Sequence, residues 1–303
     1  MKIVEPQVEL WKQEPTLEGA WHQIARATRV CYQSKPREGE SDKAFINRVI
    51  IKPATREDGS INFDKCHGAM LEHGTIYLTI PRTSFVARTI HYMHNNYSRV
   101  LFGALFHDNN NDYVTTNMRV ILENKWQDDL QFISAPDLHI ERTTFSVITD
   151  IGVTRELNRH RVNSIAEQST RYCTYSADKF GNEVTYTSNS PFLECVADDK
   201  SYFSELCEDI TNNSYKSTWD AKHYYAFGLL AAEFAYLGLK KNKVTNDIAR
   251  QVLNLNTKSQ AVYTAFDDDW QHFIKLRANN VSGKVHPNMK IIADKIKELF
   301  DNK

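Results

Sequence analysis

The sequence predicts an α+β protein with a central antiparallel sheet flanked by helices. The first eighty residues combine strand-like runs with a helix, and the C-terminal half is mostly helical. No motif repeats at a period of about 20–50 residues, which argues against a solenoid, and no flexible linker divides the chain. We therefore expect a single domain over residues 1–303, with an insertion at about 82–137 after the first core strands.

The N-terminal half contains one clear helix and several strands. A helix is expected around residues 17–27, and the run TIYLTI at 75–80 predicts a strand that Pro81 ends, because proline cannot donate to a strand ladder. Residues 82–137 are rich in Asn, His and Asp, although YVTTNMRVILEN within them predicts a strand leading into a short helix. A further strand is expected at 142–149.

The remaining elements are predicted to be helices. One begins near Asp150 and carries GVTRELNRHR. Residues 224–239 are apolar on nearly every side, which is typical of a helix buried in the protein or in an oligomer. Gly238 and the lysines after it are plausible stop signals. The last two helices are expected to begin near Asp267 and Pro287.

The charge balance excludes whole-surface attraction to polyanions. Lys and Arg number 37 against 38 Asp and Glu, so no global basic field would draw the chain to nucleic acid or to a membrane. Any anion chemistry must be local. A nucleic-acid binder using the arginines and Tyr172 and Tyr175 stays an alternative, but phosphate-backbone binding relies on many cationic contacts.

Cysteine usage and the N-terminus favour a soluble cytoplasmic protein that is not exported. The five cysteines show neither a CxxC pair nor zinc-site spacing, so we expect reduced thiols. The opening MKIVEPQVEL has glutamates where a signal peptide needs an apolar run. These cysteines are Cys31, Cys66, Cys173, Cys195 and Cys207.

An arginine lies on an apolar helix stripe near the C-terminus. In DDDWQHFIKLRANN, Arg277 follows Trp270, Phe273 and Ile274 at i, i+3, i+4 and i+7 spacing. A buried guanidinium without a partner costs several kcal/mol, so an acidic residue or an anionic ligand should meet it. An internal salt bridge is the commoner explanation. Arg250 is a weaker case that, taken alone, is expected at the surface.

The stretch RHRVNSIAEQSTRYC concentrates arginines among hydrogen-bonding side chains. Arg155 and Arg159 lie one helical turn apart, and Arg161, Ser169 and Arg171 follow. Arginine suits a bidentate grip on phosphate or carboxylate, which serine hydroxyls and backbone N–H groups complete. A solvated helix end is the alternative, but such faces favour lysine and glutamate, whereas this one uses arginine alone.

The run DKCHGAMLEHG raises the question of a metal. His67, Glu72 and His73 fit neither HExxH nor its relatives, and no third ligand is evident, so no metal is expected. Hydrogen-bonding residues of a loop or pocket are the favoured interpretation.

Taken together, these features resemble the flavin-dependent thymidylate synthase family. Its signature is Arg-His-Arg, seven residues, Ser, and an Arg two further on, and here it is RHR-VNSIAEQ-S-T-R. The blocks ATRVCY, CHGAMLEH, IARQVLNL and HFIKLR resemble other family segments in the same order. The resemblance covers most of the chain outside the insertion.

The resemblance implies an enzyme, an FAD-dependent methyltransferase and oxidoreductase of dTMP biosynthesis. It implies a cytoplasmic homotetramer with shared active sites that forms dTMP from dUMP with FAD, methylene-tetrahydrofolate and NADPH. Arg277 would be catalytic, stabilising charge on the pyrimidine. The implied dUMP-binding residues are Glu156, Arg159, Glu167, Gln168, Ser169, Thr170, Arg171, Arg250 and Arg277. The implied FAD-binding residues are His67, Ala69, Arg159, His160, Arg161, Glu167 and His272.

The chain departs from the family where FAD is held. Phe266, Asp267 and Asp268, followed by His272, stand where many members have an Asn-x-Arg group and then Asn. Glu156 replaces a common Gln. A different one-carbon product, such as hydroxymethylation of dUMP, or another uracil nucleotide as substrate is therefore an alternative on the same fold.

Overall fold

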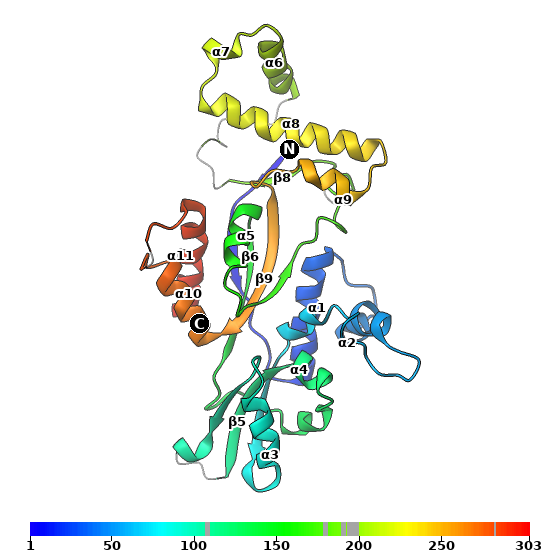
Figure 1. Ribbon diagram of the computed structural model, residues 1–303, viewed down its shortest axis with the longest axis vertical. Coiled ribbons are helices and arrows are strands. Elements are labelled where there is room, and N and C mark those ends of the chain that lie inside the picture. The colour runs from blue at the N-terminus through cyan, green and yellow to red at the C-terminus, as the bar shows by residue number, and fades with distance from the viewer. Residues whose placement is uncertain (107–109, 178–180, 189–191, 193–199, 282) are drawn as a thin grey trace.

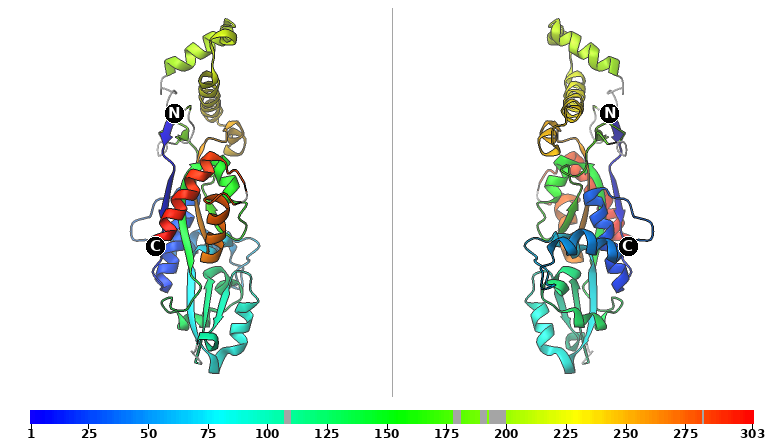
Figure 2. Two further views of the ribbon diagram at one scale, coloured as in Figure 1. Left: turned by 90° about the vertical axis from the view of Figure 1, so that its left-hand side faces the viewer. Right: turned by 90° about the vertical axis from the view of Figure 1, so that its right-hand side faces the viewer.

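The computed structural model describes residues 1–303 except 107–109, 178–180, 189–191, 193–199 and 282. The molecule is elongated, with a three-stranded sheet at one end, a four-stranded sheet in the middle and a group of helices at the other end (Figures 1 and 2). Three hydrophobic clusters correspond to this arrangement.

The middle of the molecule is an antiparallel sheet with strand order β2-β6-β9-β7. The two longest strands, β6 and β9, pair along their whole length, from Arg142 opposite Phe266 to Asp150 opposite Lys258. The predicted α+β class with a central antiparallel sheet is confirmed. The strands are β2 (Gln7–Leu10), β6 (Arg142–Asp150), β7 (Ser164–Glu167) and β9 (Lys258–Phe266).

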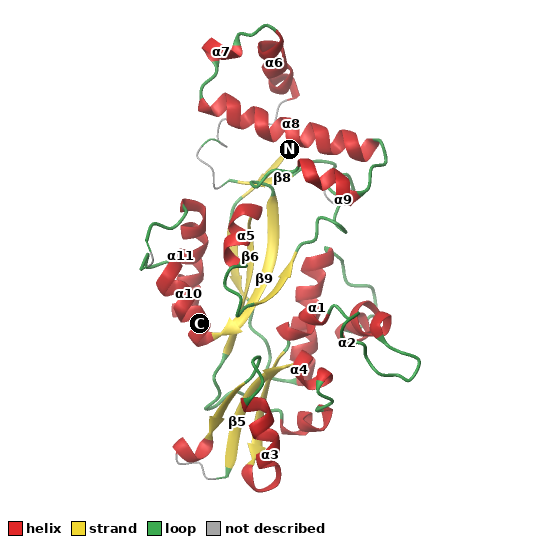
Figure 3. Cartoon of the chain, viewed as in Figure 1, coloured by secondary structure: helices red, strands yellow, loops and turns green. Residues whose placement is uncertain are grey.

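Helices cover both faces of this sheet (Figures 1 and 3). Tyr263 of β9 packs with Trp270 and Phe273 in one cluster, whereas its neighbour Val262 packs with Ile24 in the other. This follows from the strand period of two, which points successive side chains to opposite faces. The covering helices are α1 (Leu17–Tyr32) on one face, and α10 (Asp267–Arg277) and α11 (Pro287–Asp301) on the other.

Residues 82–137, the expected insertion, supply most of a second sheet. Its order is β3-β5-β4, all antiparallel, and Pro81 closes β3 as the sequence predicts. The predicted strand-to-helix run is β5 followed by α4, whose first turn is capped by the Asn117 side chain accepting from Val120 N at 3.1 Å. The elements are β3 (Thr75–Pro81), α3 (Arg82–Met93), β4 (Arg99–Phe102), β5 (Asn111–Asn117) and α4 (Met118–Glu123).

Shorter elements complete the N-terminal half. Helix α2 (Asp42–Ile46) and a following π-turn pack against α1, and the 3-10 segment Gly68–His73 leads into β3. The helix expected from Asp150 is α5 (Ile151–Leu157), and the Asp150 side chain caps it by accepting from Val153 N at 2.7 Å. It ends before His160, so the RHR motif lies in a turn rather than on a helix.

The helical end of the molecule is built around α8 (Ala221–Lys241). The helix continues through Gly238 and ends at Lys240 and Lys241, the lysines that the sequence marks together with Gly238 as stop signals, with its C-cap at Asn242. One face buries Leu229 and Tyr236, while Phe234 is 69% exposed. The neighbouring elements are the parallel pair β1 (Lys2–Val4) and β8 (Thr185–Thr187), and helices α6 (Lys200–Thr211), α7 (Tyr215–Thr218) and α9 (Asn246–Ala249).

The helices and the cysteines bear on two predictions from the sequence, that the chain does not span a membrane and that its thiols are reduced. In the described ranges no helix is long and apolar enough to cross a membrane. Cys31, Cys66, Cys173 and Cys207 are free thiols, whereas Cys195 lies outside the described residues.

Candidate functional site

A cavity of about 590 Å³ opens where β7 ends. The predicted residues Glu167, Gln168, Ser169 and Thr170 line it together with Arg250, which lies some eighty positions later in the sequence. The remaining lining residues are Ile151, Arg155, Gln251, Leu253, Asn254, Leu255 and Ser259. The structure thus brings the motif and the C-terminal arginine block into one site, which we call the loop cavity.

The carboxylate of Glu167 is fixed at both oxygens. Asn158 Nδ2 donates to Oε2 at 3.2 Å, and Ser259 Oγ donates to Oε1 at 2.8 Å. Asn158 is oriented in turn by Tyr263, whose hydroxyl donates to its Oδ1 at 2.9 Å. A carboxylate with both oxygens hydrogen-bonded is a pre-oriented acceptor for a ligand donor.

The loop after Glu167 is held by its backbone. Gln168 N donates to Gln260 O at 2.7 Å, and Ser169 N donates to Cys31 O at 3.0 Å. The Ser169 hydroxyl accepts from Arg171 N at 3.3 Å and has no base beside it in the described part of the chain. This arrangement suits binding rather than nucleophilic attack.

Two guanidinium groups face the loop cavity. Arg250 donates to Thr170 Oγ1 at 3.3 Å, and neither Arg250 nor Arg155 pairs with a carboxylate among the described residues. Arg171, by contrast, pairs with Asp247 at 2.8 Å on the surface. Arg155 is not among the dUMP-binding residues that the family resemblance implies. Its position one helical turn before Arg159 was the sequence feature that indicated a role in anion binding.

Arg277, His160 and Glu156 form a second cluster on the other side of α5. Arg277 Nε donates to His160 Nε2 at 3.3 Å, and its Nη1 lies 3.6 Å from Glu156 Oε2. Burial, helped by Arg277 and His272, lowers the pKa of His160 to about 4, so the imidazole is neutral and can accept. The acidic partner expected for Arg277 is therefore present, but Arg277 does not line the loop cavity.

The two clusters meet through α5. Glu156 lines a neighbouring cavity of about 700 Å³, and this cavity shares Arg155 and Leu255 with the loop cavity. Helix α5 thus contributes Arg155 to the loop cavity and the adjacent Glu156 to the cluster around Arg277.

His67 contacts Tyr32, and Tyr32 in turn packs against Tyr172 of the loop after β7. Its Nδ1 is 3.3 Å from the Tyr32 hydroxyl, and the Tyr32 ring is 5.4 Å from that of Tyr172. Burial raises the pKa of Tyr32 to about 12, so its hydroxyl stays protonated. Tyr32 was missed as a site residue, although the ATRVCY block contains it. Ala69, next to His67, is exposed.

The other predicted FAD residues are open to solvent. Arg159 and Arg161 are exposed, and their side chains make no hydrogen bond or ion pair with the described part of the chain. His272 is also exposed, on α10, close enough to influence the pKa of His160.

Phe266, which stands where many family members have a flavin-binding residue, lies against two arginines that were not predicted from the sequence. The Arg99 guanidinium, from β4 of the insertion, lies 4.5 Å from the centre of the Phe266 ring, and that of Arg142 lies 5.4 Å away. Burial and the neighbouring Asp268 raise the pKa of Asp269. Arg99 of the 82–137 segment thus lies against Phe266 and close enough to act on the charge of Asp269, the neighbour of Asp268.

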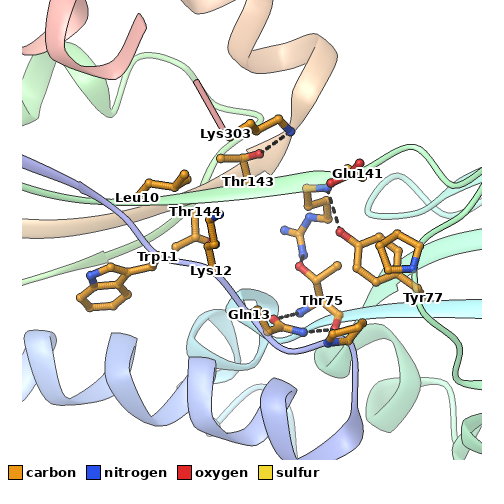
Figure 4. Close-up of a pocket in the computed structure, with 13 residues that line it drawn as sticks. Leu10, Trp11, Lys12, Gln13, Thr75, Tyr77, Glu141, Thr143, Thr144 and Lys303 are labelled. Carbon is orange, nitrogen blue, oxygen red and sulfur yellow. Dashed lines mark hydrogen bonds between the residues drawn. The ribbon is translucent and has the colours of Figure 1, made fainter. Parts of the chain in front are cut away.

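Another cavity, of about 320 Å³, lies between β2, β3 and β6 and contains none of the predicted residues (Figure 4). Gln13 and Thr75 pair with each other in its wall: Gln13 Nε2 donates to Thr75 O at 2.7 Å, and Gln13 Oε1 accepts from Thr75 N at 2.9 Å. Lys303 reaches Thr143 Oγ1 at 3.1 Å. Because none of the predicted site residues lines this cavity, we do not take it as the candidate site.

Glu72 and His73, which were considered as metal ligands, both have protein partners. His73 is fully buried, with Nδ1 2.9 Å from Thr264 Oγ1, and Glu72 pairs with Arg119 at 2.6 Å. No group of three or more His, Cys, Asp or Glu side chains suited to a metal occurs in the part of the chain that the structure describes.

Comparisons with known proteins identify one family. The family model of the thymidylate synthase complementing protein matches residues 138–303. No curated protein matches the sequence. Solved structures that match the chain include a UMP/dUMP methylase, PolB, from Streptomyces cacaoi bound with 5-Br UMP. This match has 14% identity and a TM-score of 0.41, and it covers 100% of this chain and 92% of that chain. Thymidylate synthase X from Helicobacter pylori with FAD and dUMP shows 17% identity and a TM-score of 0.37, over 97% of this chain and 92% of that chain.

Proposed function

The chain belongs to the thymidylate synthase complementing protein family, the flavin-dependent thymidylate synthases, and we propose that it forms dTMP from dUMP by reductive methylation. In this proposal methylene-tetrahydrofolate supplies the carbon and NADPH supplies the electrons. The observation that carries the proposal is the loop cavity, in which the motif residues Glu167 to Thr170 meet Arg250.

The loop cavity has the chemistry of a nucleotide monophosphate site. Arg155 and Arg250 are cations without carboxylate partners among the described residues, and the Ser169 hydroxyl lies beside them. Phosphate is bound well by guanidinium forks together with hydroxyls. The fixed Glu167 carboxylate would accept a hydroxyl or N–H of the nucleotide.

Arg277 would act on the pyrimidine. A half-buried guanidinium that is held in orientation by a neutral imidazole can stabilise negative charge as it develops on the ring. Because Arg277 lies across α5 from the loop cavity, we propose that the complete site combines Arg277 of one subunit with the loop of another. A homotetramer with shared sites fits this separation.

The residues present suit FAD, although by a different set of contacts from those of the family. Arg159 and Arg161 offer free guanidinium groups for the diphosphate, and the surface of Tyr32, His67 and Tyr172 offers rings for stacking. We propose that Arg99 replaces the cation lost at Asp268. When bound, FAD supplies the hydride-transfer chemistry, for which the side chains provide only orientation and charge.

The test is spectroscopic and kinetic. Purified protein should show flavin absorbance after incubation with FAD, and the spectrum should change when dUMP is added. NADPH oxidation should depend on both dUMP and methylene-tetrahydrofolate and should yield dTMP. Protein that takes up no flavin under any of these conditions would exclude the proposed reaction.

A second candidate keeps the site and changes the product. Asp268 and the insertion alter the surroundings of the flavin position, which favours considering a hydroxymethylated product or another uracil nucleotide. Mass spectrometry of the product formed from dUMP and from UMP separates the two candidates, because a hydroxymethyl group is one oxygen heavier than a methyl group.

A further inference from the structure

A separate cavity of about 320 Å³ lies on the opposite side of the loop from the loop cavity. Gln168 lines both cavities, but Lys258 lines only this one and its neighbour Ser259 lines only the loop cavity. Strand alternation explains the division, because consecutive side chains of β9 point to opposite faces. We call it the lysine cavity.

Lys258 is a partly buried cation with one hydrogen-bond acceptor. Its Nζ donates to Gln168 Oε1 at 2.8 Å, and no carboxylate lies within ion-pair distance of it among the described residues. Burial lowers the pKa of Lys258 to about 8, a shift increased by Lys2 and opposed by Cys173. An ammonium group in such surroundings gains from an anionic partner.

The Gln168 amide adds a donor to the same cavity. A lysine can only donate, so the oxygen of the amide must face Nζ and the NH₂ group must point away from it. That NH₂ group makes no hydrogen bond within the described part of the chain. Lys2 also lines the cavity, so two ammonium groups and a free amide donor converge there.

The acidic residue of the lysine cavity has a cationic partner other than Lys258. Glu183 Oε2 lies 3.5 Å from the amino group of Met1, which also pairs with Glu233 at 3.2 Å. The Tyr175 hydroxyl donates to Lys258 O at 3.1 Å, and burial keeps the pKa of this tyrosine raised. Lys258, Lys2 and the Gln168 amide therefore supply the donors of the cavity.

We propose that the lysine cavity binds a small oxyanion, held by Lys258, Lys2 and the amide NH₂ of Gln168. The ligand class is a compact phosphate-like or carboxylate anion, because the volume admits only a small molecule. This site is separate from the nucleotide site, and the proposal does not depend on the reaction that the protein catalyses.

Calorimetric titration of the full chain with sulfate, and in parallel with succinate, tests the site and distinguishes a tetrahedral anion from a carboxylate. Lys258→Met should weaken binding by roughly tenfold or more, because it removes a charge-assisted contact and keeps the side-chain length. Lys240→Met is the matched control, because Lys240 is also partly buried and donates to one oxygen, Val244 O, at 2.7 Å. Anion binding by the Lys240→Met variant should equal that of the unmodified chain.

Arg250→Met separates the two cavities. If the lysine cavity binds sulfate, the isotherm of Arg250→Met keeps this site, whereas that of Lys258→Met loses it and retains only binding at the loop cavity. Binding that is lost with Arg250→Met but kept in Lys258→Met would place the anion in the loop cavity and overturn the proposal. The absence of binding by either anion to the unmodified chain would overturn it as well.

The pH dependence gives an independent readout. Lys2, Cys173, Tyr175 and Glu183 surround the ammonium group, and sulfate keeps its charge across the range used. Since the pKa of Lys258 is about 8 without a ligand, sulfate affinity should fall roughly tenfold between about pH 7 and 9 as the amine loses its proton. A flat profile over that range would contradict the role of Lys258.

Discussion

Arg277 donates a hydrogen bond from Nε to Nε2 of His160 at 3.3 Å, joining the last turn of α10 to the turn that follows α5. The contact requires a neutral imidazole, and the low pKa of His160, about 4, provides one at any physiological pH. The signature histidine therefore orients the arginine rather than repelling it.

Replacing Arg277 by lysine should remove most of the activity and leave the fold intact. A flexible ammonium cannot keep the planar fork that reaches both His160 and Glu156, so kcat for dTMP formation should fall by about 100-fold or more. Flavin absorbance should be retained. Lys275→Met, an exposed change on the same helix, serves as the control. Turnover close to that of the unmodified enzyme would remove Arg277 from the catalytic role.

Ser259→Ala should lower stability modestly and weaken nucleotide binding. The change removes one hydrogen bond to a charged group, which contributes about 1.5 kcal/mol to folding. It also leaves Glu167 Oε1 free, so the carboxylate is less well oriented and the KM for dUMP should rise. Steady-state kinetics with varied dUMP measure the effect. Ser134→Ala is the matched control, because this hydroxyl pairs with Thr79 at 2.7 Å in the other sheet. An unchanged KM in Ser259→Ala would mean that Glu167 needs no such support.

His73 should make the protein sensitive to acid. Burial lowers its pKa from 6.5 to about 3, so below pH 6.5 the unfolded chain binds a proton that the folded chain does not. Stability is therefore lost as the pH falls, by about 2 kcal/mol between about pH 7 and 5. Denaturant titrations at both pH values test this, and His73→Gln should reduce the loss relative to a surface variant such as His94→Gln. Equal losses in both variants would exclude His73 as the cause.

Asp150→Ala should loosen the helix that connects the two clusters. The carboxylate caps α5 at Val153 N, and losing a cap costs about 1 kcal/mol. We expect a lower free energy of unfolding together with weaker nucleotide binding, because α5 carries Arg155 and Glu156. Asp150→Asn should restore most of both, since asparagine also caps well. Loss of stability without any effect on binding would show that the cavities do not depend on the position of α5.

Much of the fold follows from local patterns, and the exceptions have identifiable causes. The helices at 17–32 and 287–301 were predictable because each buries one apolar stripe. Strand β9 was not predicted, because Val262 and Tyr263 face different cores and the strand shows no polar alternation. Helix α8 passes through Gly238 and ends at the lysines that follow it, because a glycine inside a helix is tolerated where packing supplies the stability.

Some residues of the candidate site could likewise be predicted from the sequence, and others could not. Glu167 to Thr170 were found from a motif of fixed spacing, Arg250 from the IARQVLNL block, and Arg155 from the arginine-rich stretch. Arg99 and Lys258 were not found, because their relevance depends on what folding brings beside them: a phenylalanine ring for Arg99 and the amide of Gln168 for Lys258. Neither of these neighbours is close in sequence.

Strand β9 also sets the spacing of the whole site. Its first residues, Lys258 and Ser259, hold the loop, and its last residue, Phe266, continues directly into the helix that carries Arg277. At about 3.3 Å per residue the two ends lie roughly 26 Å apart. Deleting one residue from β9 would shift one end relative to the other and exchange the faces on which Lys258 and Ser259 lie, so evolution can change the side chains of this strand far more easily than its length.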